Sequence, residues 1–148
     1  MIVFVRPSGV AYALQYTVID EMGGFIGQVP SKGHVKHVTD SGRHRYILWS
    51  NGTGVMDVDM AADKTYYVYV PANGGDLLPI KRGTSDWDSA VDWTDGSTEW
   101  DSEPERAKKW TEERTEGIAL QLERAKSVWS AHTDEERQRY TMAATDGR

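Results

Sequence analysis

Residues 65–70 read Thr-Tyr-Tyr-Val-Tyr-Val, an unbroken run of side chains that favour β-strands. Because side chains alternate across a strand, one face of this segment carries Tyr66, Val68 and Val70. The other face carries the remaining three side chains. Both faces are largely apolar, which is typical of a central strand that is covered on both sides. The segment therefore predicts a strand-rich domain with this strand in its interior.

Short strand signals separated by turn residues fill the rest of residues 1–83. The expected strands cover residues 2–6, 11–19, 25–29, 34–39, 45–49, 55–60, 65–70 and 77–81. Their spacing is close to the roughly 8–12 residues of sandwiches and barrels. Residues 34–39 are polar enough to indicate an edge strand, and Asn51-Gly52 indicates a tight hairpin. We predict a mainly β fold: a β-sandwich of about seven or eight strands with a C-terminal helical arm.

Three stretches of this region resemble a bacterial family. They are residues 4–8 (Phe-Val-Arg-Pro-Ser), 29–33 (Val-Pro-Ser-Lys-Gly) and 41–44 (Ser-Gly-Arg-His), followed later by Asp-Lys-Thr-Tyr-Tyr-Val at 63–68. The pattern is similar to that of small β-sandwich domains of unknown function related to PEGA-like domains, over about residues 1–82. The resemblance implies an immunoglobulin-like or PEGA-like sandwich that serves as an envelope-associated binding or structural module.

The composition limits the kinds of partner and chemistry. The chain has 148 residues and no cysteine, which excludes disulfides, thiolate metal sites and a cysteine nucleophile. The net charge of −6 divides into +1 for residues 1–83 and −7 for residues 84–148. Nucleic acid and anionic lipid are bound through clustered Lys and Arg, which neither part supplies. We therefore expect no nucleic-acid partner.

The start of the chain lacks the basic region and the long apolar run of a signal peptide. No apolar run approaches the roughly 18 residues of a membrane span, so we expect no membrane insertion. The expected location is cytoplasmic for the chain as written, or the bacterial envelope if a leader was removed.

Residues 84–102 form an acidic segment with a repeated acid-Trp-polar pattern at Trp87, Trp93 and Trp100. We interpret it as a connector. Tryptophan dominates interface energetics, so three in a connector indicate that the segment packs against something. Two alternatives follow. The segment folds back across the sandwich and caps an open edge, or it docks on another chain.

Residues 103–148 indicate a helical arm, with one helix over about 103–131 and a short second helix over about 134–144. Ser102 with Glu105, and Thr133 with Glu136, match capping boxes at the two helix starts. A narrow apolar stripe runs along the first helix and is interrupted near Gly117. Such a helix needs support, either from its own sandwich or from another subunit.

Catalytic and metal-binding patterns are weak. The sequence has no Gly-x-Ser-x-Gly motif and no serine beside a histidine and an acid, so we expect no enzyme, no catalytic residue and no cofactor. His34 and His37 point to opposite faces of a strand, and with His44 they do not predict a metal site. Asp57 and Asp59 share a strand face, which we interpret as the solvated side of a half-exposed strand.

The sequence therefore predicts a non-enzymatic protein-interaction or assembly subunit. The connector and the arm would dock on a protein partner or on copies of the same chain, as a homo-oligomer. The predicted partner-binding residues are Trp87, Trp93, Trp100, Trp110, Ile118, Leu122 and Trp129. The alternative function is an envelope-associated ligand-binding module, for example for glycan, with Trp49, Tyr67 and Tyr69 in its site.

Overall fold

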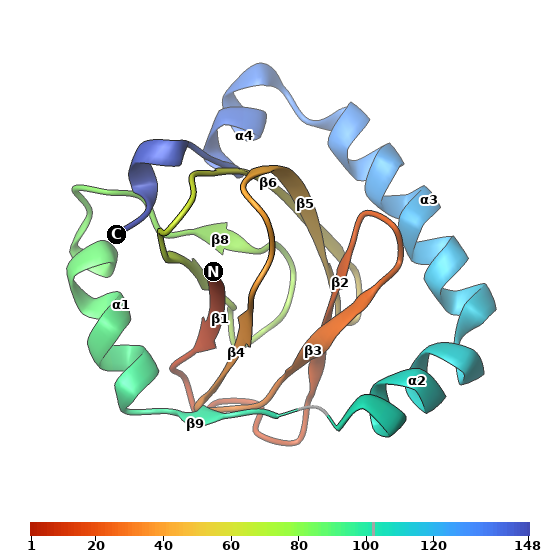
Figure 1. Cartoon of the computed structure of the whole chain (residues 1–148). Coiled ribbons are helices and arrows are strands. Elements are labelled where there is room, and N and C mark those ends of the chain that lie inside the picture. Colours follow the sequence, from red (N-terminus) through yellow and green to blue (C-terminus); the bar gives the residue numbers. More distant parts are fainter. Residues whose placement is uncertain (102) are drawn as a thin grey trace.

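The computed structural model describes residues 1–101 and 103–148 and contains two five-stranded sheets with helices on their outer faces (Figure 1). The strands are β1 (Ile2–Arg6), β2 (Tyr16–Asp20), β3 (Phe25–Val29), β4 (Gly33–His37), β5 (Gly42–Trp49), β6 (Thr53–Met60), β7 (Tyr66–Tyr69), β8 (Leu78–Pro79), β9 (Thr98–Glu99) and β10 (Thr141–Met142). The helices are α1 (Ser85–Asp95), α2 (Pro104–Glu113), α3 (Thr115–Ala131), α4 (Asp134–Arg139) and the 3-10 turn η1 (Ala144–Asp146).

The first sheet has the order β8-β7-β1-β4-β9. β1 pairs antiparallel with β4 but parallel with β7, in a register that places Ile2 opposite Tyr66. The predicted interior position of residues 65–70 is confirmed, because β7 lies between β8 and β1. The predicted edge position of residues 34–39 is wrong. The two-residue strand β9 pairs with β4 through Gly33 and His34 and covers its open edge.

The second sheet has the order β10-β6-β5-β2-β3. β5 and β6 form the hairpin expected at Asn51-Gly52, with a continuous antiparallel register from Gly42 opposite Met60 to Trp49 opposite Thr53. β10 adds to the far edge of β6 in parallel. This last strand was not expected, since residues 134–144 were predicted to be helical throughout.

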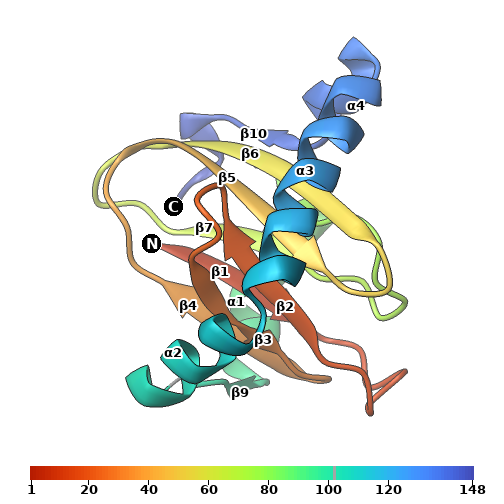
Figure 2. The same cartoon turned by 90° about the vertical axis from the view of Figure 1, so that its right-hand side faces the viewer.

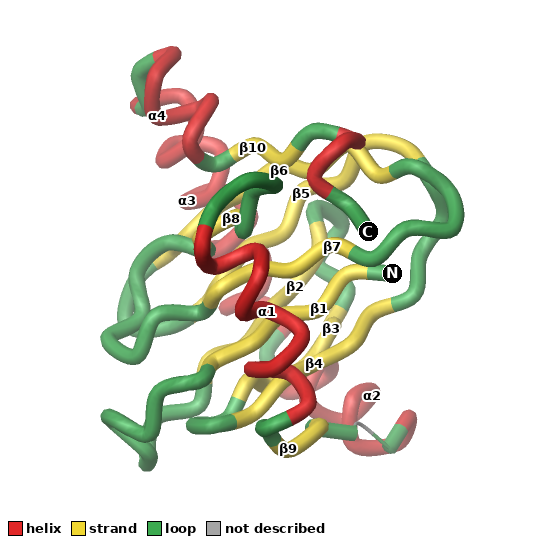
Figure 3. The backbone as a smooth tube through the Cα atoms, turned by 90° about the vertical axis from the view of Figure 1, so that its left-hand side faces the viewer, coloured by secondary structure: helices red, strands yellow, loops and turns green. Residues whose placement is uncertain are grey.

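One apolar core lies between the inner faces of the two sheets. It includes Phe4 and Tyr66 from the first sheet and Leu48, Met56 and Met142 from the second. Two further clusters cover the outer faces. Helices α2 and α3 lie on the second sheet, and α1 lies across the first (Figures 2 and 3). Residues 65–70 are thus covered on both sides, as their composition predicted.

Three predicted segments differ from the observed ones. The strand predicted over residues 11–19 begins only at Tyr16, because residues 10–14 form a turn in which Ala11 adopts a φ of 55°. The helix predicted over residues 103–131 is divided at Arg114, whose φ of −125° leaves the helical region. The connector predicted over residues 84–102 contains α1, which begins where the Thr84 side chain accepts a hydrogen bond from the Trp87 amide.

The helix-start predictions have separate outcomes. The capping box of Thr133 and Glu136 at α4 is confirmed in both of its hydrogen bonds. Pro104 occupies the first turn of α2, where its missing N–H is tolerated. The other predicted capping box includes Ser102, which lies outside the described residues.

The strand-rich character of residues 1–83 is confirmed. Both sheets combine parallel with antiparallel pairs, and three helices of at least ten residues pack on their outer faces. This arrangement is not specific to an immunoglobulin-like or PEGA-like domain.

Candidate functional site

The three connector tryptophans all pack on their own chain. Trp87 and Trp93 lie over Tyr67 and Tyr69 on the outer face of the first sheet. The ring centroids of Trp93 and Tyr69 are 5.8 Å apart. Trp100 follows β9 and contacts the Phe25 ring at 5.8 Å. Of the two alternatives predicted for this segment, folding back across the sheet and capping an edge is the one observed.

The arm residues are also occupied within the chain. Trp110 and Ile118 are only 9% and 8% exposed and pack, with Leu122 and Trp129, on the outer face of the second sheet. The interruption of the apolar stripe at Gly117 has a steric reason. A Cβ at this position would lie 2.6 Å from Cη2 of Trp49, so glycine lets α3 approach the indole closely.

The residues predicted for the alternative ligand site are not brought together. Tyr67 and Tyr69 lie beneath α1 on the first sheet. Trp49 belongs to the second sheet, packs under α3 and meets Trp110 edge-on at 5.7 Å. Part of Trp49 borders a shallow hollow of about 190 Å³ that Gln28 and Arg114 also line.

A prominent apolar surface lies on the turn between β1 and β2, which projects beyond the sheets (Figure 2). We call residues 10–14 the apolar turn. Val10 is 69% exposed, Tyr12 82% and Leu14 52%. This surface was not predicted from the sequence, because the alternation of Tyr12, Leu14 and Tyr16 matches a strand. The signal for a turn was the preceding Pro7-Ser8-Gly9.

The backbone of the apolar turn is fixed by Arg6, which is completely buried. Its guanidinium donates to the carbonyl oxygens of Leu14 at 2.6 Å, Ala11 at 2.9 Å, Val10 at 3.1 Å and Ala72 at 3.4 Å. It also lies 4.4 Å from the ring centroid of Tyr16. Burial lowers the pKa of Arg6, and the carbonyl oxygens offset its lost hydration.

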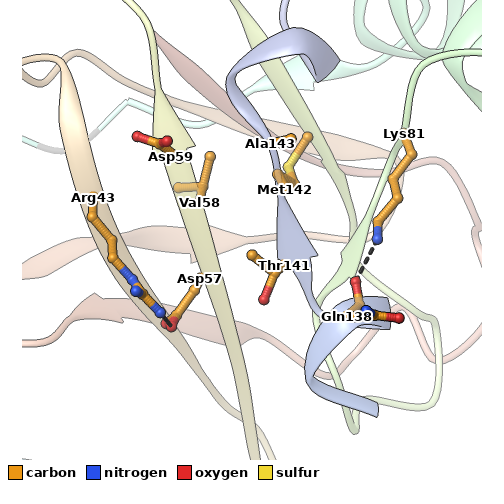
Figure 4. A pocket seen from close by; sticks show the side chains of 9 residues that line it. All are labelled: Arg43, Asp57, Val58, Asp59, Lys81, Gln138, Thr141, Met142 and Ala143. Carbon is orange, nitrogen blue, oxygen red and sulfur yellow. Dashed lines mark hydrogen bonds and ion pairs between the residues drawn. The ribbon is translucent and has the colours of Figure 1, made fainter. Parts of the chain in front are cut away.

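A second candidate surface is a hollow of about 650 Å³ beside β6 and β10 (Figure 4). We call it the charged hollow. Arg43, Asp57 and Asp59 lie on one side of it and Lys81 with Gln138 on the other, with Met142 and Ala143 of the C-terminal segment between them. The Lys81 ammonium donates to the main-chain carbonyl of Gln138. This size is within the roughly 300–1,000 Å³ of small-molecule sites.

Asp57 forms part of the wall of the charged hollow and is 2% exposed. Its Oδ1 accepts from Nε of Arg45 at 2.7 Å, and its Oδ2 accepts from Nη2 of Arg45 at 3.0 Å and Nη2 of Arg43 at 2.9 Å. The carboxylate raises the pKa of Arg43. The interpretation of Asp57 as a solvated side chain is therefore wrong, because two arginines of β5 make its burial possible.

The structure brings a serine, a histidine and a glutamate together where the sequence showed no such motif. Nδ1 of His34 is 2.7 Å from Oγ of Ser97, and Nε2 is 3.6 Å from the Glu99 carboxylate. The Ser97 hydroxyl donates to the Thr94 carbonyl, so it accepts from His34. In a hydrolytic pair the histidine instead accepts the serine proton. This cluster joins the end of α1 to β4.

Burial lowers the pKa of His34, and Lys36 acts in the same direction, while Glu99 opposes both. The other two histidines considered for a metal site, His37 and His44, lie next to the ring of Tyr46. The described residues hold no group of three or more His, Asp or Glu side chains with the geometry to bind a metal ion.

Comparisons with family models, with curated protein sequences and with solved structures found no match to this chain. None of the helices in residues 1–101 and 103–148 has both the length and the apolar character needed to cross a bilayer. The apolar turn and the charged hollow are therefore the two surfaces from which a function can be inferred.

Proposed function

We propose that the chain is a non-enzymatic protein-interaction module whose contact surface is the apolar turn. The observation that carries this proposal is the exposure of three large apolar side chains, Val10, Tyr12 and Leu14, on one short connection. Clustered exposed apolar side chains mark interaction sites more often than isolated ones do. Their position at a projecting end of the molecule favours contact with a protein surface.

The rigidity of the turn supports the same proposal. Binding costs less conformational entropy when the contact segment is already held in its bound shape. Arg6 supplies that order through its carbonyl contacts, and the Ala11 main chain is held in the left-handed region at a φ of 55°. Such strain is tolerated where the surrounding structure fixes the backbone, often at a functional segment.

The proposal keeps the predicted class of function but moves the contact surface. The connector and arm side chains stabilise the fold, whereas the apolar turn is available to a protein partner or a second copy. Assignment to the PEGA-like family and the absence of catalysis belong to the proposal as well. The family assignment rests on the sequence resemblance of about residues 1–82.

Site-specific photo-crosslinking in cells tests the contact surface. A photoreactive side chain replaces Tyr12, and in a control protein it replaces Glu135, an exposed position on α4. We expect a discrete adduct from position 12 that is lost when Leu14→Ser is added. An adduct of twice the chain mass identifies a second copy. Equal adduct formation from positions 12 and 135 would contradict the proposal.

A further inference from the structure

We propose that the charged hollow binds a small molecule with one carboxylate group and a short apolar body. This inference goes beyond the interaction proposed for the apolar turn and uses different residues at a different place. It depends on the charges of Arg43 and Lys81, on the apolar groups between them and on the position of Asp59.

The two cations that flank the hollow have charge available for an anion. Nε and Nη2 of Arg45 already donate to both oxygens of Asp57. The hydrogen bond from Nη2 of Arg43 is therefore an additional one to a carboxylate that Arg45 already neutralises. The Arg43 side chain is 72% exposed, which leaves its other N–H groups accessible. Lys81 donates to a neutral carbonyl, and no carboxylate in the described part of the chain pairs with it.

The middle of the hollow suits an apolar group. The apolar group exposed there is Ala143, which lies between the two cations in Figure 4, whereas Met142 and Val58 beside it are buried in the core between the sheets. The side chain of Thr141 is occupied, because its hydroxyl donates to the Arg137 carbonyl. An anionic head near Arg43 or Lys81 would therefore place a short aliphatic body over the C-terminal segment.

Asp59 limits the charge that the ligand can carry. It lies opposite Arg43 in the β5–β6 register and is exposed at the mouth of the hollow. A second fixed negative charge repels polyanions, whereas a singly charged head group can still gain a charge-assisted hydrogen bond from either cation. The repulsion from Asp59 favours a monocarboxylate over a phosphate ester, which carries close to two negative charges at about pH 7.

The experiment uses nuclear magnetic resonance titrations of the full chain with hexanoate, hexyl phosphate and hexylammonium. We expect hexanoate to produce saturable shifts in the amides of Asp59, Met142 and Ala143. We expect Arg43→Gln and Lys81→Gln each to weaken its affinity by about tenfold. Lys126→Gln is the matched control, since Lys126 is exposed on α3 and does not line the hollow.

Three results would overturn the inference. Hexylammonium binding as tightly as hexanoate would show that the cations do not select the ligand. Tighter binding of hexyl phosphate would contradict the preference for a single charge. Unchanged affinity in both Arg43→Gln and Lys81→Gln, with spectra that confirm the native fold, would place the binding elsewhere.

Discussion

Arg45 and Asp57 face each other across β5 and β6, and the guanidinium of Arg45 holds both oxygens of the buried carboxylate. The same guanidinium lies 4.6 Å from the ring centroid of Trp129 on α3. This pair therefore connects the β5–β6 hairpin to the helix that covers it. A bidentate arginine-carboxylate pair fixes geometry more strictly than a single hydrogen bond does.

Replacing Asp57 tests the importance of this pair. Asp57→Asn keeps the size of the side chain but removes the charge that two arginines share, so we expect the free energy of unfolding to fall by about 1–3 kcal/mol. Chemical denaturation measures it. Asp59→Asn, on the same strand but exposed, is the control and should change stability by less than about 0.5 kcal/mol. Equal effects of the two substitutions would contradict the assignment.

Replacing Arg6 tests the order of the apolar turn. Arg6→Lys leaves one compact ammonium where a planar group now reaches four carbonyl oxygens, so we expect a loss of about 1–3 kcal/mol in stability. Amide exchange in residues 10–14 should accelerate, and the crosslink from position 12 should weaken. Arg124→Lys, at an exposed position on α3, is the control. Unchanged exchange in Arg6→Lys would show that other contacts order the turn.

The buried His34 predicts a pH dependence. Its pKa is held below the ordinary 6.5, so the unfolded chain binds a proton at a pH where the native chain does not. Stability should therefore fall as pH decreases below about 6.5. Urea unfolding at about pH 7 and about pH 5 measures this loss, which should be smaller in His34→Asn. Part of it should persist, because burial also lowers the pKa of His37. A loss as large in the variant as in the native chain would rule out His34 as its source.

Gly117 predicts a steric coupling between α3 and β5. Alanine is favoured over glycine in a helix by about 1 kcal/mol, yet here its Cβ would meet the Trp49 ring. We expect Gly117→Ala to lower stability by about 1–3 kcal/mol. In the double variant with Trp49→Phe, the combined loss should be about 1 kcal/mol smaller than the sum of the single losses. Strict additivity would show that the two residues do not compete for space.

The strands of residues 1–83 could be predicted because their signals are local. Alternation and turn residues located seven of the eight to within a few residues, and the two apolar faces of residues 65–70 correctly indicated cover on both sides. Helix α1 had a local signal that was overlooked. Thr84 precedes it as a cap, and Trp87 and Ala90 follow at helical spacing, but the high density of acids resembled a solvated connector.

The candidate sites could not be predicted, because they arise from contacts between distant segments. The burial of Asp57 depends on arginines of the neighbouring strand and on β10, whose two residues have no strand signal of their own. The apolar turn depends on Arg6, which no pattern distinguishes from a surface arginine. The surface against which the tryptophans pack could not be predicted for the same reason. An apolar stripe on a helix shows that the helix must pack against another surface, but it does not show whether that surface belongs to the same chain.

The parallel strand pairs impose an order on folding. Ile2 pairs with Tyr66, Gly33 with Thr98, and Asp57 with Thr141, so each pair joins segments that are far apart in the chain. Chains dominated by such non-local pairings fold in about milliseconds to seconds, more slowly than helical bundles of similar size. During synthesis, one edge each of β1, β4 and β6 stays open until its late partner emerges from the ribosome. The nascent chain is most exposed to aggregation during that interval.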